Sequence, residues 1–151
     1  MAQTTRDRLI SVATDLFYQH GFQAVGLDQI LTEVGITKTA FYKHFESKDD
    51  LIVAVLQARD RQDMAEWTAY FLEHGGDDPK RRLLAVFDLL DDWFGQPNFR
   101  GCMFINAATE FPSHNDPIHK MAAAHSANLQ TQLLQFAEAA VAVVRIRDPP
   151  A

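Results

Sequence analysis

The sequence predicts an all-α protein, and three observations indicate that fold class. Apolar residues recur at helical spacing, three or four apart, along almost the whole chain. The segments with this spacing stop at glycine, as at Gly21, Gly35 and the pair Gly75-Gly76. The alternation typical of a β-strand is confined to the short stretch VAVVRI near the C-terminus. We therefore expect helices joined by short turns.

Composition narrows the class of protein further. Of 151 residues, 47% are hydrophobic and 23% are charged, as in a globular domain and unlike a disordered or membrane-spanning chain. The single cysteine, Cys102, cannot form a disulfide within the chain, and charges interrupt the N-terminal region where a signal peptide would be apolar. We expect a cytoplasmic protein with no membrane partner. A net charge of −6 disfavours indiscriminate binding to polyanions but leaves room for a local basic patch.

The first third of the chain predicts three short helices. Leu9, Ala13 and Phe17 lie on one helical face that ends before Gly21. A second helix follows from position 27 to the residue before Gly35, and helical spacing resumes with Phe41 and the aromatic residue four positions later. Two short helices that meet at a tight glycine turn are typical of a helix-turn-helix.

The remainder predicts longer helices. Ser47 and Asp50 resemble a capping box and begin a helix that reaches His74. A further helix starts at Asp78-Pro79 and ends before Gly95; its wide apolar face predicts burial on two sides. A short segment at 102–111 precedes a final long helix that begins at 115–117 and runs through position 136.

The stretch KTAFYKHF, at residues 38–45, is the main candidate site. Phe41 and Phe45 share one face, which leaves amines, hydroxyls and a phenol on the other face, where they reach phosphates or base edges. Residues 35–48 carry a local charge of +2 within the acidic chain. By spacing alone, DNA binding and an ordinary solvated helix face are equal alternatives.

A family resemblance favours DNA binding. Residues 5–51, with LFYQHGF, LDQILTEVGITK and FYKHFESKDDL in order, resemble the N-terminal domain of the TetR family of bacterial transcriptional regulators. The resemblance implies a helix-turn-helix at 1–47 and a helical ligand-binding and dimerisation domain at 48–151. It also implies a homodimer that represses transcription at a palindromic operator in double-stranded DNA until a small molecule binds. Gly26-Leu27 and RGCMFINAATEF are similar to the LmrA-type drug-responsive subgroup.

The resemblance also assigns residues to sites. The DNA-facing positions correspond here to Thr37, Lys38, Thr39, Tyr42, Lys43, His44 and Lys48. Two positions depart from the family pattern. Many members have Ser or Thr at the position of Gly26, where a hydroxyl caps the second helix and contacts phosphate, and many have Gly at the position of Thr39. The first departure predicts weaker anchoring on the DNA backbone.

An apolar or aromatic effector is expected between the helices of the second domain. Its predicted contacts, each of which has an ordinary core residue as the alternative, are Trp67, Phe71, Phe87, Trp93, Met103, Phe104, Asn106 and Glu110. No metal or other cofactor is expected. His114, Asp116 and His119 do not match a zinc signature, and Pro117 interrupts them. Cys102 is interpreted as an inert thiol.

Enzyme motifs are lacking: the sequence has no glycine-rich phosphate loop and no Gly-x-Ser-x-Gly turn. We expect a regulator and not an enzyme; the alternative is a helical interaction module that keeps the fold without operator binding. Relatives continue into another long dimerisation helix, whereas this sequence ends in AVAVVRIRDPPA. Its β-branched run and Pro149-Pro150 disfavour a further helix. We therefore expect a shortened second domain with an exposed apolar face at Leu129, Leu133 and Phe136, and a weakened dimer.

Overall fold

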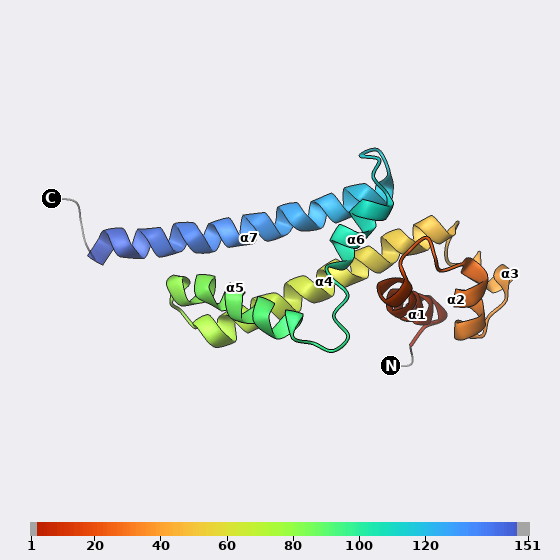
Figure 1. The fold of residues 1–151 in the computed structure, drawn as a ribbon, viewed down its shortest axis with the longest axis horizontal. Helices are drawn as coiled ribbons and strands as arrows, with labels where there is room; N and C mark the ends of the chain where they lie inside the picture. The colour runs from red at the N-terminus through yellow and green to blue at the C-terminus, as the bar shows by residue number, and fades with distance from the viewer. Residues whose placement is uncertain (1–2, 148–151) are drawn as a thin grey trace. The chain divides into compact units, whose positions relative to one another are not determined.

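The computed structural model describes residues 3–147, with side chains through residue 144. The expected all-α class is confirmed: the described residues form helices joined by turns and contain no strand. In chain order (Figure 1) the helices are α1 Thr5–His20, α2 Leu27–Val34, α3 Lys38–Phe41, α4 Lys48–Gly75, α5 Pro79–Phe94, α6 Met103–Glu110 and α7 Pro117–Arg147. Within the same residues, no helix is both long and apolar enough to cross a membrane.

The ends of α1 and α2 follow from their local sequence. Thr4 and Asp7 form a capping box at the start of α1, which satisfies amides that have no partner inside the helix. Gly35, with φ of 74°, ends α2 in the left-handed region that glycine adopts without strain. The amide of Ile36 donates to the carbonyl of Leu31 at 3.1 Å, as in a Schellman motif. The predicted bounds of both helices are confirmed.

The third helix is shorter than the spacing predicted. The α-helix ends at Phe41, and residues 42–44 continue as turns. The amide of His44 donates to the carbonyl of Phe41 at 2.8 Å, an i to i+3 bond that tightens the chain. Because this turn still brings Phe45 inward, the predicted pairing of Phe41 and Phe45 is confirmed: both are buried, with ring centroids 5.8 Å apart.

The chain forms two compact units. The first unit contains the residues up to Asp60 together with Arg100–Ala124, and the second contains Arg61–Phe99 together with the residues from His125 onward. A single core fills the first unit. Its buried side chains are Leu9, Ala13, Phe17, Phe22, Val25, Ile30, Leu31, Val34, Phe41, Phe45, Leu51, Ile52, Ala54, Val55, Leu56, Met103, Phe104, Ala107, Ile118 and Ala122.

In the second unit, α5 folds back along the C-terminal half of α4 (Figure 1). Trp93 of α5 packs edge-on against Trp67 of α4, with ring centroids 6.2 Å apart. The prediction that α5 is buried on two sides is wrong for this chain. Ala85 is the only residue of α5 that is buried, and Phe87 keeps 68% of its surface exposed. Leu84, Phe87 and Phe94 of α5 each keep more than half of their surface exposed, so part of the apolar face stays open in the described structure.

Helix α7 differs from the sequence-based expectation at its C-terminal end. The β-branched run from Val141 has poor intrinsic helix propensity, yet α7 continues through Arg147. Propensity is a weak preference, and a long helix propagates through such residues once it is nucleated. The apolar face that was expected to be exposed is half-buried at Leu129, Leu133 and Phe136. Exposed apolar side chains of α7 include Leu134 and Val144. Pro149 and Pro150 lie outside the described residues.

Candidate nucleic-acid interface

The turn from α2 into α3 presents the predicted DNA-facing side chains. Thr37 begins α3 as its N-cap, with its hydroxyl accepting a hydrogen bond from the amide of Ala40 at 3.2 Å. Phe41, completely buried, pins the other side of this short helix to the core. As a result the polar side chains face solvent: Tyr42 is 52% exposed, and Lys38, Thr39, Lys43 and His44 are exposed.

Lys48 differs from the other predicted contacts because it also has an internal partner. Its Nζ donates to the carbonyl oxygen of Val25 at 2.7 Å, and the side chain is half-buried. This bond joins the start of α4 to the residue that precedes Gly26, the N-cap of α2. The hydrogen bond therefore holds the ammonium group of Lys48 beside the N-terminal end of α2. Free amides and the helix dipole favour an anion at that end.

The N-cap of α2 lacks a side-chain hydrogen bond. Gly26 has φ of −77° and ψ of 155°, an extended conformation open to any residue, and a Cβ placed there would meet nothing within 4 Å. The site therefore has room for the hydroxyl side chain that many family members carry. The backbone conformation does not require glycine at this position, and the glycine leaves the first turn of α2 without a side-chain cap.

Two arginines of α1 belong to this region and were missed by reasoning from the sequence. The guanidinium of Arg6 lies over the ring of Phe45, 5.0 Å from its centroid, which holds a cation beside the turn that follows α3. Arg8 donates through Nη2 to the carbonyl of Val34 at 2.6 Å and so ties α1 to the end of α2. Both lie outside residues 35–48, over which the local charge was counted. Because they are two positions apart they do not share a helical face, so their positive charge was the only signal in the sequence.

Both ends of α6 are tied to α1 and the loop that follows it. The hydroxyl of Tyr18 accepts from the amide of Arg100 at 2.9 Å and donates to the carbonyl of Gly101 at 3.1 Å, just before α6. At the other end, the carboxylate of Glu110 accepts from the amides of Phe22 and Gln23, at 3.0 and 2.8 Å. These bonds fix α6 against the segment that leads into the helix-turn-helix.

The eight predicted effector contacts fall into two separate groups. Met103, Phe104, Asn106 and Glu110 belong to the first unit, where Met103 and Phe104 are core residues and Asn106 donates to the carbonyl of Arg100 at 3.1 Å. The other four belong to the second unit: Trp67, Phe71, Phe87 and Trp93. Their role in binding an effector stays a prediction.

Within the second unit, part of that second group forms an aromatic cluster between α4, α5 and α7. Trp67 packs edge-on against His125 as well as Trp93, and the rings of Phe71 and Phe136 meet edge-on at 5.3 Å. Phe71 is buried, whereas Trp67 and Trp93 are half-buried. Phe87 lies outside this cluster on an exposed face of α5.

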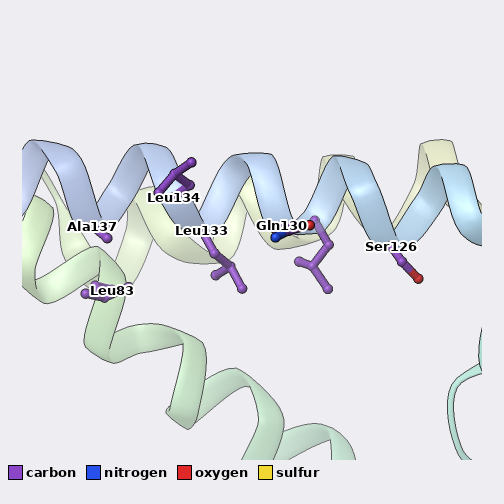
Figure 2. Close-up of a pocket in the computed structure, with 7 residues that line it drawn as sticks. Leu83, Ser126, Gln130, Leu133, Leu134 and Ala137 are labelled. Carbon is purple, nitrogen blue, oxygen red and sulfur yellow. The ribbon is translucent and has the colours of Figure 1, made fainter.

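An open apolar groove of about 550 Å³ lies between α5 and α7 in the second unit. Figure 2 shows Leu133 and Ala137 of α7 approaching Leu83 of α5. The groove is aliphatic, with two polar side chains at one end; its full lining is Leu83, Ser126, Leu129, Gln130, Leu133, Leu134 and Ala137. None of the eight predicted effector contacts is in this lining.

The fold and the exposed α3 define a helix-turn-helix protein, and comparison with known proteins identifies its family. Residues 9–55 match the family described as bacterial regulatory proteins, tetR family. Residues 79–149 match the family described as tetracyclin repressor-like, C-terminal domain. Since the two matches together take in most of the chain, the protein belongs to the TetR family. Its placement in the LmrA-type subgroup stays a prediction.

Individual relatives agree with this assignment. A TetR-family transcriptional regulator from Streptomyces coelicolor has 34% sequence identity and a TM-score of 0.84, over 89% of this chain and 66% of that one. The transcriptional repressor NemR of Escherichia coli (strain K12) is 28% identical over 110 residues, 70% of this chain and 53% of NemR. The transcriptional activator FasR of Mycolicibacterium smegmatis is 40% identical over 52 residues, 34% of this chain and 24% of FasR. These relatives are transcriptional regulators, in agreement with the prediction that the chain is not an enzyme.

Proposed function

We propose that the protein is a transcriptional regulator that binds duplex DNA through α2 and α3. The observation that supports this proposal most directly is that α3 and the turn after it have one buried face and one exposed face. Phe41 and Phe45 are buried, while Lys38, Thr39 and Lys43 remain exposed on the segment between and beside them. A recognition element requires this separation, because its inner face must hold its orientation while its outer face enters the major groove.

Roles within the interface follow from the side chains. Lys43 and Lys48 bear compact positive charges and suit phosphate oxygens, which fix the docking position but carry no sequence information. Lys38 and Thr39, at the start of α3, suit base edges, since the first residues of a recognition helix make the base contacts in a helix-turn-helix. Tyr42 and His44 supply further hydrogen-bonding groups beside them.

The regulator acts, in this proposal, as a homodimer on an inverted repeat. A protein two-fold axis matches a palindromic operator with half-sites one helical turn apart, ~34–36 Å. Binding an apolar or aromatic small molecule in the second unit favours a spacing of the two DNA-binding units that misses this separation, which relieves repression. The aromatic cluster around Trp67 and the aliphatic groove beside Leu133 are the two features that fit such a molecule.

Selection of duplexes from a random pool tests the DNA-binding part of the proposal. We expect an inverted repeat to be enriched, and we expect its affinity to fall steeply as salt is raised, because phosphate binding releases counterions. The alternative, an interaction module without operator binding, predicts no enrichment and no duplex binding at low salt. The Lys43→Ala protein tests the interface directly: its exposed side chain can be removed without disturbing the core, and the variant should bind the enriched duplex more weakly.

A second experiment tests the effector. Small apolar molecules that bind the protein are titrated into the complex with the enriched duplex, and DNA affinity is measured at each concentration. Ligands that bind and release DNA support the repressor mechanism. If every bound ligand leaves DNA affinity unchanged, the mechanism is wrong even though the DNA-binding proposal stands.

A further inference from the structure

The loop between α6 and α7 brings two histidines together. The amide of Asp116 donates to the carbonyl of Ser113 at 2.9 Å, which closes a turn, and Asp116 then caps α7 by accepting from the amide of Ile118 at 2.8 Å. This geometry places His114, in the loop, beside His119, in the first turn of α7. Their ring centroids lie 4.7 Å apart and the ring planes meet at 37°. The spacing of these residues does not match a zinc signature, but the turn at 113–116 brings the two rings together.

One of the two rings is fixed in a form suited to metal binding. Nδ1 of His119 lies 2.9 Å from the carbonyl oxygen of Phe111. A carbonyl only accepts hydrogen bonds, so Nδ1 carries the hydrogen and the lone pair of the neutral ring belongs to Nε2. A backbone carbonyl that holds a ring in this way is the usual outer-shell partner of a metal-bound histidine. His119 is half-buried and His114 is exposed, so solvent reaches the pair.

From this pair we infer a binding site for a late first-row divalent metal ion, with one imidazole nitrogen from His114 and one from His119. An ion about 2.0–2.1 Å from an imidazole nitrogen lies roughly 3.2 Å from that ring's centroid. At a nitrogen–metal–nitrogen angle of about 90–110°, two rings on one ion therefore have centroids about 4.5–5.3 Å apart. The observed 4.7 Å falls in this interval. Imidazole suits Ni²⁺, Cu²⁺ and Zn²⁺, whereas Mg²⁺ and Ca²⁺ require oxygen ligands.

The site would keep open coordination positions. Among the described residues, no group of three or more histidine, cysteine or acidic side chains is arranged to hold a metal. Water therefore completes the coordination, and the affinity is lower than that of a closed four-ligand site. The bound ion would link the loop at His114 to the first turn of α7, and the carbonyl of Phe111 joins His119 to the end of α6.

Isothermal titration with Ni²⁺ tests the inference, with protein that carries no histidine tag. We expect one ion per chain, and we expect affinity to fall about tenfold or more in His114→Ala and in His119→Asn. Asparagine is chosen because its side-chain amide can still donate to the carbonyl of Phe111 while the second ring nitrogen is lost. His74→Ala, in the second unit, is the matched control and should bind as the original chain does.

Two results would overturn the site. One is unchanged affinity in His114→Ala or in His119→Asn, provided that circular dichroism shows both variants folded. The other is loss of binding in His74→Ala. As an independent readout, Ni²⁺ should raise the melting temperature of the original chain and leave that of His114→Ala unchanged, because a ligand stabilises the folded state only where it binds. Equal shifts in both proteins would also contradict the inference.

Discussion

Gln23 donates two hydrogen bonds to Glu110, one from its backbone amide and one from its side chain. The amide of Gln23 donates to Oε2 of Glu110 at 2.8 Å, and Nε2 of Gln23 donates to the backbone carbonyl of Glu110 at 2.7 Å. The second carboxylate oxygen accepts from the amide of Phe22 at 3.0 Å. The loop after α1 and the last residue of α6 are therefore fixed to each other. If α6 moves when an effector binds, this loop must move with it or lose three hydrogen bonds.

Replacing Glu110 should destabilise the protein. Glu110→Ala leaves two backbone amides without their carboxylate partner, and hydrogen bonds to a charged group contribute about 1.5–3 kcal/mol each. We expect the free energy of unfolding to fall by at least about 1.5 kcal/mol, measured by urea denaturation. Glu110→Gln should give an intermediate value, since its amide retains one accepting oxygen.

Glu138→Ala is the matched control for this experiment. Glu138 is an exposed carboxylate on α7, so its removal should change the free energy of unfolding by less than about 0.5 kcal/mol. If Glu110→Ala were no more destabilising than Glu138→Ala, the contacts with Phe22 and Gln23 would contribute nothing measurable, and the proposed rigid connection would be wrong.

Gly26→Ser should strengthen both the fold and DNA binding. A serine fits the extended backbone and the open space at this N-cap, and its hydroxyl can accept from the amides of the first turn of α2. The gain in unfolding free energy is a few tenths of a kcal/mol, the usual difference between serine and glycine caps. Affinity for the selected duplex should rise as well, because the hydroxyl can donate to a phosphate oxygen.

Gly26→Ala separates the hydroxyl from the effect of adding a Cβ. Alanine fits the same space but cannot accept from an amide or donate to phosphate. We expect Gly26→Ala to bind DNA no more tightly than the original chain. Equal DNA affinities for the serine and alanine variants, measured by fluorescence anisotropy, would show that the missing hydroxyl does not limit anchoring.

Helix positions were predictable because local signals agreed with the tertiary structure. The glycine at 35, the cap at Asp78 and the proline at 117 each fix a boundary through backbone geometry that depends on few neighbours. The end of α7 was not predictable from propensity, because propagation of a long helix outweighs the small cost of each β-branched residue. The exposure of α5 was not predicted, because an apolar face shows that a helix can be buried but does not show that another helix is present to cover it.

The candidate site was predicted in part for the same reason. The exposed residues of α3 follow from periodicity, since Phe41 and Phe45 fix which face is turned inward. The bond between Lys48 and the carbonyl of Val25, and the position of Arg6 over Phe45, depend on how distant segments pack. Periodicity also cannot distinguish a core methionine from a ligand contact, and it therefore grouped Met103 with Trp67, which lie in different units.

Stability at alkaline pH should depend on Tyr70. Partial burial raises the pKa of Tyr70 above its usual 10.0, and its hydrogen bond to Oδ2 of Asp92 at 3.1 Å and the nearby acidic charges act in the same direction. A raised pKa means that the folded state favours the protonated phenol. This stabilisation is complete below pH 10 and is lost as the pH rises through the folded pKa.

A comparison of melting temperatures between pH 8 and pH 11 checks this expectation. The Tyr70→Phe variant has no phenol to ionise, so its melting temperature should decline less above pH 10 than that of the original chain. Tyr42→Phe is the matched control for the loss of a tyrosine hydroxyl, because Tyr42 is an exposed tyrosine of the first unit. Parallel curves for Tyr70→Phe and the original chain would contradict the expected contribution.

Lys43 and Lys48 should separate the electrostatic and structural parts of DNA binding. Each alanine variant removes one phosphate contact, so the slope of log affinity against log salt should become shallower by about one, while the preferred sequence is kept. The two differ in stability. Lys43→Ala should unfold with the free energy of the original chain, whereas Lys48→Ala loses the 2.7 Å bond to Val25 and should lose about 1 kcal/mol.

Lys120→Ala completes the set, since Lys120 is an exposed cation of α7 in the first unit that the proposal does not place on DNA. Its salt slope and unfolding free energy should match those of the original chain. A Lys48→Ala protein that is less stable but keeps the full salt slope would show that this ammonium positions α2 without touching phosphate. An unchanged slope in Lys43→Ala as well would mean that the exposed face of α3 does not dock on DNA, and the proposed interface would have to be abandoned.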